Sequence, residues 1–214
     1  MSTGIVVIGA AGFGRESLDV LEAMIVAGAD IEIAGVVDDA LAEVNGARLE
    51  ERGVRFLGTR AQWLATSPKN LRYVLGIGHP GVRRRLVGEL DAAGIEPFTA
   101  VHPSATFGAN TTLAEGVVVC AGAAISNNVR LGRHVHVNPH VTIGHDSILH
   151  DFSSINPAAV ISGEVVVRSE VLVGAAATIL QQLEVGERTT VGAGSLVTKN
   201  VPSDVIVKGV PGRW

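Results

Sequence analysis

The fold is decided by residues 101–197, where a large apolar side chain occurs at every sixth position. Residues 137–149, for example, read VNPHVTIGHDSIL, in which Val137, Ile143 and Leu149 occupy the repeating position. A helix has no six-residue period, and a plain strand repeats every two residues. The period therefore predicts short strands separated by tight turns, each with one aliphatic side chain facing the inside of a parallel β-helix. The repeating positions are Val101, Phe107, Leu113, Val119, Ile125, Leu131, Val137, Ile143, Leu149, Ile155, Ile161, Val167, Val173, Ile179, Val185, Val191 and Val197.

The residues around each repeating position suit such turns. Two residues earlier the side chain is mostly small or β-branched, as at Ala123. Glycine often follows, as Gly144 follows Ile143, and glycine adopts backbone angles that other residues resist. We expect the coil to span residues 98–197, with residues 198–214 as a tail that closes its end, because a solenoid needs capping.

Residues 1–97 carry the pattern of an α/β nucleotide-binding domain. We expect a buried strand at 4–8, a glycine turn, a helix over 15–27 and a second strand at 31–37. Such a unit offers backbone N–H groups to a phosphate, and the acids after the second strand can bind a ribose or a base. Its glycine order, G-x-x-G-x-G, departs from the dinucleotide fingerprint G-x-G-x-x-G, and a tight turn without a ligand is the alternative. The residues concerned are Gly9, Gly12, Gly14, Asp38 and Asp39.

The rest of this half-Rossmann domain is short. We expect strands at 55–58 and 71–76 and a helix over 81–93. Gly78 follows the later strand, at the edge where open α/β sheets bind their ligands. A domain of this length holds one mononucleotide-binding half rather than two, so it favours a nucleotide-linked substrate over a dinucleotide cofactor.

Composition argues against several classes of protein. The 214-residue chain has a formal net charge of −4, which does not favour a nucleic-acid partner, and its 4% of aromatic residues suits a narrow β-helix interior. Cys120 is the only cysteine, so no disulfide can form within the chain and a reducing compartment is expected. The chain starts with a strand pattern rather than a signal peptide, and no apolar run approaches ~20 residues. We therefore expect a cytoplasmic protein that does not enter the membrane.

Five of the seven histidine residues lie between positions 134 and 150. His145 stands out because Asp146 follows it and because it occupies a turn, from which its side chain points out of the coil. Imidazole titrates near neutral pH, and a carboxylate can orient the ring and stabilise its cation, so the pair suits a general base. Adjacent residues on a strand face opposite ways, so the turn must bend to bring the two side chains together. The five are His134, His136, His140, His145 and His150.

Five short motifs are spread over nearly the whole chain: GAAGFGRE (9–16), VDD (37–39), GHD (144–146), GAGSLV (192–197) and IVKGVP (206–211). Together with the domain order they resemble the hexapeptide-repeat sugar acetyltransferases of the sialic-acid, bacillosamine and perosamine type. The resemblance implies a left-handed β-helix, a homotrimer with active sites between subunits, and acetyl-CoA as co-substrate without a metal. It also implies a nucleotide-linked sugar as the acceptor.

The same resemblance assigns roles to individual residues. It implies that His145 is the general base, that Asp146 orients it, and that Asn138 has a substrate-positioning or structural role. Two positions depart from the family pattern: His150 stands where glycine is common, and Ser154 where histidine is common. The sugar nucleotide is expected at Gly9, Gly12, Gly14, Asp38, Asp39 and Gly78, and acetyl-CoA along the coil at Gly163, Gly174, Ala175, Gly192 and Ala193.

Two other functions stay open at this point. His145 and His150 also resemble the paired zinc ligands of γ-class carbonic anhydrases, which would need a third histidine from a neighbouring subunit, namely His134, His136 or His140. The other alternative is a non-catalytic trimer that binds a nucleotide sugar, since a fold does not prove an activity. For the transferase, the acceptor is an amine or a hydroxyl, and direct transfer is expected because Cys120 is remote from His145 in sequence.

Overall fold

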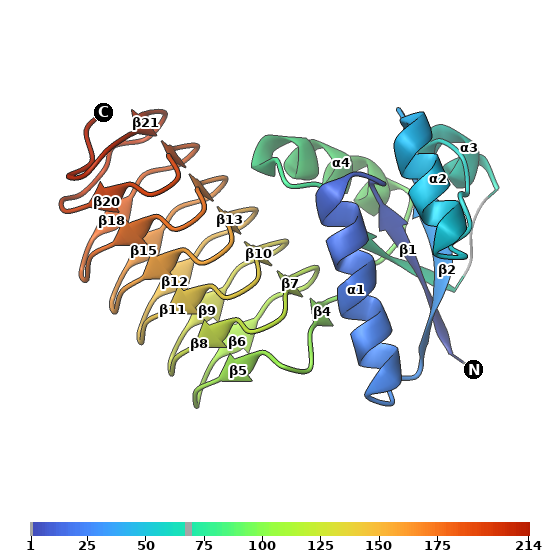
Figure 1. Ribbon diagram of the computed structural model, residues 1–214, viewed down its shortest axis with the longest axis horizontal. Coiled ribbons are helices and arrows are strands. Elements are labelled where there is room, and N and C mark those ends of the chain that lie inside the picture. The colour runs from blue at the N-terminus through green and yellow to red at the C-terminus, as the bar shows by residue number, and fades with distance from the viewer. Residues whose placement is uncertain (1, 67–69) are drawn as a thin grey trace.

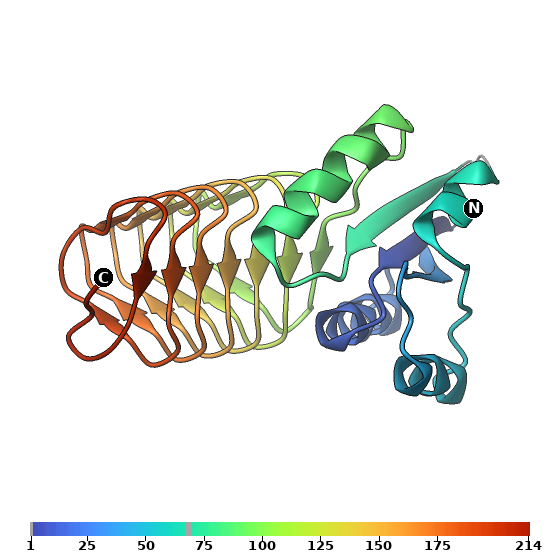
Figure 2. The same ribbon diagram turned by 90° about the horizontal axis from the view of Figure 1, so that it is seen from above.

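The chain forms an α/β domain followed by a three-sided β-coil, and the computed structural model describes residues 2–66 and 70–214 (Figure 1, Figure 2). The strands of the first domain are β1 (Thr3–Ile8), β2 (Ile31–Val37) and β3 (Leu71–Leu75), and they form a parallel sheet in the order β2-β1-β3. The helices within the described residues are α1 (Gly12–Val26), α2 (Glu43–Glu51), α3 (Arg60–Ala65) and α4 (Pro80–Ala92).

Most of the elements expected in this domain are confirmed. The three strands of the sheet and the helices α1 and α4 lie at the predicted positions. The strand predicted at 55–58 is wrong, because Phe56 makes only a single bridge, to Val36. The sequence pattern does not predict α2 or α3. In α3 the local signal is a capping box, in which Thr59 and Gln62 each accept a hydrogen bond from the other's backbone N–H.

From residue 100 the chain winds into a parallel coil with three faces. Face 1 contains β4 (Ala100–Val101), β7 (Val118–Val119), β10 (His136–Val137), β13 (Ser154–Ile155), β16 (Leu172–Val173), β19 (Thr190–Val191) and β21 (Ile206–Val207). Face 2 contains β5 (Thr106–Phe107), β8 (Ala124–Ile125), β11 (Thr142–Ile143), β14 (Val160–Ile161), β17 (Thr178–Ile179) and β20 (Leu196–Val197). Face 3 contains β6 (Thr112–Leu113), β9 (Arg130–Leu131), β12 (Ile148–Leu149), β15 (Val166–Val167) and β18 (Glu184–Val185).

Each strand pairs with the strand one turn away on the same face, and the pairing of Thr142 with Val160 shows a turn of 18 residues. We name the corners by the faces that they join: the chain passes from face 1 to face 2, then to face 3, then back to face 1. Three hexapeptides therefore make one turn, so the predicted period is confirmed as the period of the fold.

The inside of the coil is a column of stacked aliphatic side chains. The repeating positions from Val119 to Val197 are all buried and belong to one continuous apolar cluster. Phe107 is the exception and corrects the prediction, because its side chain is 39% exposed. Its strand, β5, is the first of face 2, so no earlier turn covers it on that side. The last turn of the coil is two residues shorter than the others. Val207 is buried and pairs with Val191 in β19, which is 16 residues earlier rather than 18.

The turns of the coil place one residue in each hexapeptide in the left-handed backbone region. Asn128 and Asp146 both have a φ of 58°, and Glu164 has a φ of 60°. Asparagine and aspartate tolerate this region better than most residues. The sharp change of direction is what brings side chains that are adjacent in sequence to the same outer corner.

The first domain packs against face 1 of the coil, and the end of α4 that begins at Pro80 lies beside the coil in Figure 2. The ring of Phe13 stacks on that of His136 in β10, with 4.4 Å between centroids. Ser154, in β13, donates a hydrogen bond of 3.0 Å to the carbonyl of Gly78. Cys120 is buried in the apolar cluster that α1 shares with this face. The contact therefore joins the strand ends of the sheet directly to the coil.

A buried arginine holds this contact together. The side chain of Arg83 on α4 is fully buried, and among the described residues it has no carboxylate within ion-pair distance. Its guanidinium donates to the carbonyls of Ile77 and Gly78 in the first domain and to those of Phe152 and Ser153 in the coil. Burial lowers the pKa of Arg83. The cation is thus neutralised only by backbone dipoles from both parts of the chain.

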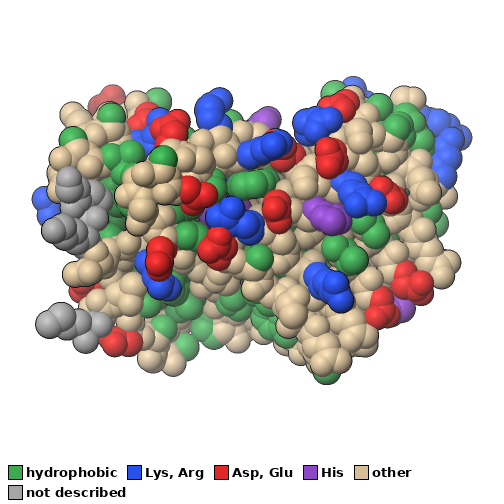
Figure 3. Space-filling model, turned by 180° about the vertical axis from the view of Figure 1, so that it is seen from behind, with side chains coloured by type: hydrophobic (Ala, Val, Ile, Leu, Met, Phe, Trp, Pro, Cys, Tyr) green, Lys and Arg blue, Asp and Glu red, His purple; other side chains and the backbone are tan. Residues whose placement is uncertain are grey.

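The surface carries charges of both signs without a large region of one sign on the face shown in Figure 3. Within residues 2–66 and 70–214, no helix is long and apolar enough to cross a membrane.

Replacing Arg83 by methionine tests its role at the domain contact. The Arg83→Met protein keeps the aliphatic bulk but loses the donors to four carbonyl groups, and each buried acceptor left unpaired costs ~1 kcal/mol or more. We expect the free energy of unfolding to fall by about 2–4 kcal/mol, measured by urea denaturation. The matched control is Arg84→Met, since Arg84 follows on the same helix but is exposed and pairs with Glu170, a contact worth about 0–1 kcal/mol. Equal midpoints for the two variants would contradict the assigned role.

Candidate functional site

His145 and Asp146 form a hydrogen-bonded pair at the corner between faces 2 and 3. Nδ1 of His145 lies 2.7 Å from Oδ2 of Asp146. The left-handed backbone at Asp146 bends the turn so that both side chains lie on the same outer edge. Their side chains are 54% and 46% exposed, so a substrate can reach them from solvent. The pairing that the sequence requires of a general base is present in the structure.

The position of the His145 ring depends on Gly163, the residue 18 positions later. A Cβ built at Gly163 would lie 2.6 Å from Nε2 and 2.7 Å from Cε1 of the imidazole. The ring therefore rests against the glycine backbone of the next turn, and no other residue fits there without moving it. With Nδ1–H donating to the carboxylate, the neutral ring keeps its lone pair on Nε2. This is the nitrogen that can accept a proton from a substrate.

Asp146 is also held from the other side. Its Oδ1 accepts a hydrogen bond of 2.8 Å from Nδ2 of Asn128, one turn earlier. Hydrogen bonds from His145 and from Asn128, in that order of importance, lower the pKa of Asp146 below its ordinary value. The carboxylate is therefore ionised at neutral pH and can stabilise an imidazolium. The sequence analysis did not single out Asn128, although the 18-residue period could have placed it beside Asp146.

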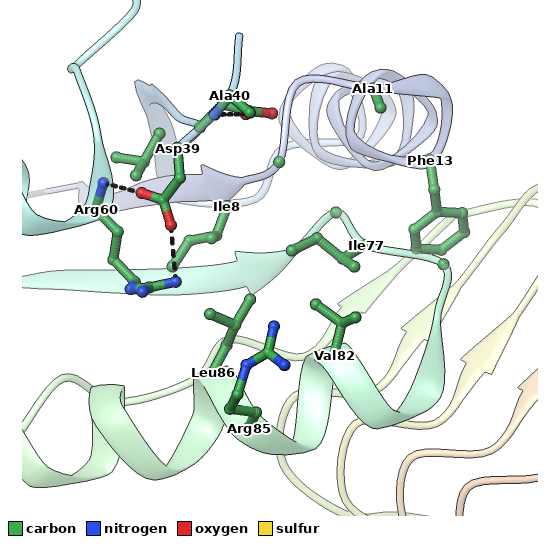
Figure 4. A pocket seen from close by; sticks show the side chains of 15 residues that line it. Ile8, Ala11, Phe13, Asp39, Ala40, Arg60, Ile77, Val82, Arg85 and Leu86 are labelled. Atoms are coloured by element: carbon green, nitrogen blue, oxygen red, sulfur yellow. Dashed lines mark hydrogen bonds and ion pairs between the residues drawn. The ribbon is translucent and has the colours of Figure 1, made fainter. Parts of the chain in front are cut away.

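A pocket of about 290 Å³ opens at the strand ends of the first domain (Figure 4). Ile8, Val82 and Leu86 supply apolar walls, and Phe13 lies at one end. Arg85 on α4 also lines the pocket and has no carboxylate within ion-pair distance among the described residues. An apolar pocket with one available cation fits a ligand that carries both a flat apolar group and an anion. The sequence analysis did not predict Arg85, because helix α4 alone does not show which residues face the pocket.

The acids predicted for this pocket lie at its rim, and both have partners within the chain. Oδ2 and Oδ1 of Asp38 accept hydrogen bonds of 2.7 Å from Ala10 N–H and 2.8 Å from Ala40 N–H. Asp39 accepts a hydrogen bond of 2.7 Å from the backbone N–H of Arg60. It also forms an ion pair of 2.9 Å with the guanidinium of the same residue (Figure 4). Asp38 thus shapes the loops around the pocket, and Asp39 fixes Arg60 beside it.

The predicted glycine residues of the pocket fall into two groups. A Cβ at Gly9 would lie 2.8 Å from the carbonyl oxygen of Gly76, and one at Gly14 would overlap the carbonyl of Gly9, so the turn itself requires both. In contrast, a Cβ at Gly12 or Gly78 would meet no atom within 4 Å. Gly78 lines the pocket, whereas Gly12 is exposed and is not among the residues that line it.

The residues predicted for acetyl-CoA lie at two different corners of the coil. Gly163 shares the corner between faces 2 and 3 with His145. The turns after β16 and β19, which carry Gly174, Ala175, Gly192 and Ala193, lie at the corner between faces 1 and 2. Ala175 and Ala193 are exposed, whereas a Cβ at Gly174 would lie 2.5 Å from the backbone nitrogen of Ala193. Within one chain these residues do not converge on one site.

Asn138 is also remote from His145 within the chain. It lies at the corner between faces 1 and 2, is only 6% exposed, and donates a 3.0 Å hydrogen bond from Nδ2 to the carbonyl of Ile155. This contact joins neighbouring turns of the coil.

The other histidine residues have separate environments. His134 and His136 are buried under the first domain, where desolvation lowers the pKa of His134 to about 3 and that of His136 well below its usual range. His140 lies at the corner between faces 1 and 2, and His150 at the corner between faces 3 and 1, away from that of His145. The part of the chain that the structure describes contains no group of three or more potential metal ligands.

The pocket and the histidine–aspartate pair lie on opposite sides of the coil. The first domain covers face 1, through His136 in β10 and Ser154 in β13. His145 lies at the corner between the other two faces, and in a three-sided coil this corner is opposite face 1. Within one chain the two features therefore face away from each other.

Comparison with solved structures shows that the chain has the left-handed β-helix fold of hexapeptide-repeat acetyltransferases. Perosamine N-acetyltransferase from Caulobacter crescentus, solved as a point mutant with CoA and GDP-perosamine, is similar over 98% of this chain and 95% of that chain, with a TM-score of 0.87 and 27% identity. The acetyltransferase domain of PglB from Neisseria gonorrhoeae, in complex with acetyl coenzyme A, is similar over 100% and 99%, with a TM-score of 0.85 and 26% identity.

Sequence comparison agrees with this class. Residues 4–90 match the family model of the PglD N-terminal domain. The serine acetyltransferase of Buchnera aphidicola (subsp. Acyrthosiphon pisum) is 38% identical over 117 residues, which is 53% of this chain and 36% of that protein. The chain thus matches little more than a third of the length of this curated relative. Both parts of the chain therefore resemble those of the hexapeptide-repeat sugar acetyltransferases.

Replacing Gly163 by alanine tests the geometry of the pair. The added methyl group displaces the His145 ring, so Asp146 loses the stronger of the two hydrogen bonds that lower its pKa. We expect the pKa of Asp146 to rise toward the ordinary aspartate value, measured by carbon-13 NMR of its carboxyl group. The control is Gly88→Ala on α4, where a Cβ meets no atom within 4 Å, and the carboxyl titration of Asp146 should stay as in wild type. An unchanged pKa in Gly163→Ala would show that the ring does not need the glycine.

Proposed function

We propose that the protein transfers an acetyl group from acetyl-CoA to an amine, or a hydroxyl, of a nucleotide-linked sugar. The observation that carries the proposal is the exposed pair of His145 and Asp146, with Nδ1 engaged by the carboxylate and Nε2 left as proton acceptor. The similar enzyme from Caulobacter crescentus, named an N-acetyltransferase and solved with CoA and GDP-perosamine, supports this acceptor class and favours the amine.

In this mechanism His145 acts as the general base. Nε2 takes the proton from the acceptor amine or hydroxyl as its nitrogen or oxygen attacks the thioester carbonyl carbon. The tetrahedral intermediate then collapses, the carbon–sulfur bond breaks, and the imidazolium returns the proton to the leaving thiolate. The Asp146 carboxylate stabilises the imidazolium between these two steps and keeps the ring in one tautomer.

The only thiol of the chain argues against an acyl-enzyme intermediate. Cys120 is buried against the first domain, and desolvation raises the pKa of its thiol to about 12. A thiol with so high a pKa supplies almost no thiolate at neutral pH, and the nucleophilic form of cysteine is the thiolate. Direct transfer from acetyl-CoA to the acceptor is therefore the mechanism that these residues support.

The pocket of the first domain is the proposed site for the nucleotide part of the acceptor. Its apolar walls suit a base, and Arg85 supplies a cation for phosphate oxygens. Ala11, which directly precedes the 15-residue helix α1, lines the same pocket, so the helix N-terminus can offer backbone N–H groups to this anion. Asp38 and Asp39 contribute by shaping the rim. This pocket distinguishes the chain from an acetyltransferase whose acceptor is a free amino acid such as serine.

The opposite positions of the pocket and His145 make a second copy of the chain necessary. We propose a homotrimer in which the pocket of one subunit presents the sugar to His145 of its neighbour. The two groups of residues predicted for acetyl-CoA, at Gly163 and at Gly174 to Ala193, would then face each other across the same subunit boundary.

Loss of the base should abolish turnover. With acetyl-CoA and a panel of nucleotide-linked amino sugars, we expect wild type to release CoA thiol and His145→Ala to be slower by roughly 10²–10⁴-fold. His150→Ala is the matched control, because His150 lies at the corner between faces 3 and 1, away from His145 and from both groups of residues predicted for acetyl-CoA. Release with L-serine but with none of the sugars would overturn the acceptor class. Binding of sugar nucleotides without any acetyl transfer would instead favour a non-catalytic binding protein.

Mixed assemblies test whether one site uses two subunits. We combine His145→Ala with Asp38→Ala, which removes the acceptor for Ala10 N–H and Ala40 N–H and so disorganises the pocket. Each variant alone should be inactive. In trimers formed from equal amounts of both, about one quarter of the sites should pair an intact pocket with an intact His145 of a neighbour and recover activity. No recovery in verified mixed trimers would place the whole site in one subunit.

A further inference from the structure

Asn128 holds the acid of the candidate catalytic pair from the side opposite the histidine. We propose that Asn128 is a positioning residue, which fixes the Asp146 carboxylate so that the proton of neutral His145 stays on Nδ1 and the lone pair on Nε2. The proposal deepens the proposed function, since it rests on His145 acting as a base there.

The two oxygens of Asp146 have different partners. Oδ2 lies 2.7 Å from Nδ1 of His145, and Oδ1 accepts a 2.8 Å hydrogen bond from Nδ2 of Asn128. Toward the next turn, Glu164 accepts a hydrogen bond of 3.3 Å from Gln182, and among the described residues no hydrogen bond joins Asp146 to Glu164. Asn128 is therefore the only side-chain donor, besides His145, that restrains the carboxylate.

The orientation of the Asn128 amide is itself determined by a third side chain. Nδ2 of Asn110, one turn before Asn128, donates a hydrogen bond of 3.2 Å to Oδ1 of Asn128. With its oxygen engaged there, the amide must point its NH2 group at Asp146. The reverse orientation would bring the amide oxygen against a carboxylate and would leave two NH2 groups facing each other. Asn110 thus donates to Asn128, Asn128 donates to Asp146, and the Asp146 carboxylate also accepts from His145, so the hydrogen bonds converge on Asp146 from both sides.

The backbone conformation of the turns does not by itself require this row of hydrogen-bonded side chains. Asn110 and Asn128 occupy left-handed turn positions, with φ of 60° and 58°, and other turns of the coil fill the same position with alanine, phenylalanine or arginine, for example at Ala158, Phe152 and Arg188. The fold therefore accepts many side chains at this position, whereas only a donor at position 128 can reach Oδ1 of Asp146. Supporting electrostatics point the same way, because the hydrogen bond from Asn128 helps to keep the pKa of Asp146 low.

The decisive comparison uses glycine at the two asparagine positions. Asn128→Gly and Asn110→Gly both keep a residue that suits the left-handed region, but only the first removes a direct contact with Asp146. Asn128→Asp adds a third test, since it keeps the size and the turn preference and replaces the NH2 donor by a charged acceptor. The thermal midpoint of each variant, measured with the purified full chain, establishes that the coil is intact.

The first readout is the tautomer of His145, recorded by nitrogen-15 NMR of histidine-labelled protein, with His145→Ala to assign the signals. In wild type at a pH where the ring is neutral, we expect the proton on Nδ1. Asn128→Gly and Asn128→Asp should shift the population toward a mixture of tautomers, and Asn110→Gly should change it least. Wild-type populations in both Asn128 variants would overturn the proposal. This readout needs no substrate, so it decides the proposal even if the proposed transferase activity proves wrong.

The second readout is steady-state kinetics. We expect Asn128→Gly to lower kcat about tenfold, equivalent to ~1.4 kcal/mol, and Asn128→Asp to lower it further, with the KM values for both substrates nearly unchanged. Asn110→Gly should stay within about threefold of wild type, since it acts on Asp146 only through Asn128. Equal losses in Asn110→Gly and Asn128→Gly, or a change confined to KM, would show a general effect on the corner and would overturn the positioning role.

Discussion

The structure depends on one geometric constraint, the stacking of identical 18-residue turns. Between residues 100 and 197 each strand residue lies beside the residue 18 positions earlier or later, as the strand pairs show. Inside, this stacks aliphatic side chains into a continuous core that needs few aromatic rings. Outside, it stacks turn residues into columns, so that Asn128 meets Asp146 and the ring of His145 rests on Gly163. The candidate catalytic pair is therefore held by the repeat itself rather than by a separate loop.

The same constraint explains why histidine residues so close in sequence have different properties. A shift of a few residues along the chain moves a side chain to another face or corner. His134 and His136 lie under the first domain, where desolvation keeps their rings neutral. His145, about half-exposed at the opposite corner, is the one that also has a carboxylate within hydrogen-bond distance. Clustering in sequence therefore did not mean clustering in space, and among the described residues no three potential metal ligands come together.

The contact between the two domains sets the function apart from that of a bare β-helix. Arg83, Ser154 and Gly78 join the strand ends of the sheet to face 1 through hydrogen bonds to backbone carbonyls. Position 154, where the family often has histidine, is in this chain part of that contact. Because the first domain covers face 1, its pocket is fixed on the side away from His145. In the proposed function one chain therefore supplies two half-sites, which the proposed homotrimer would bring together.

The sequence by itself determined the β-helix, because a strict six-residue period of aliphatic side chains has one structural solution and depends only on local spacing. It also predicted the main elements of the first domain and singled out His145 with Asp146 as the candidate general base and its partner. Only the tertiary structure decided what lies beside them: that Phe107 is exposed at an uncovered end, that Gly9 and Gly14 serve the turn, and that Arg85 lines the pocket. Asn128 belongs to the same group, since its role depends on a contact between turns. Such contacts depend on where each side chain points at a corner of the coil. The spacing of residues in the sequence does not determine this orientation.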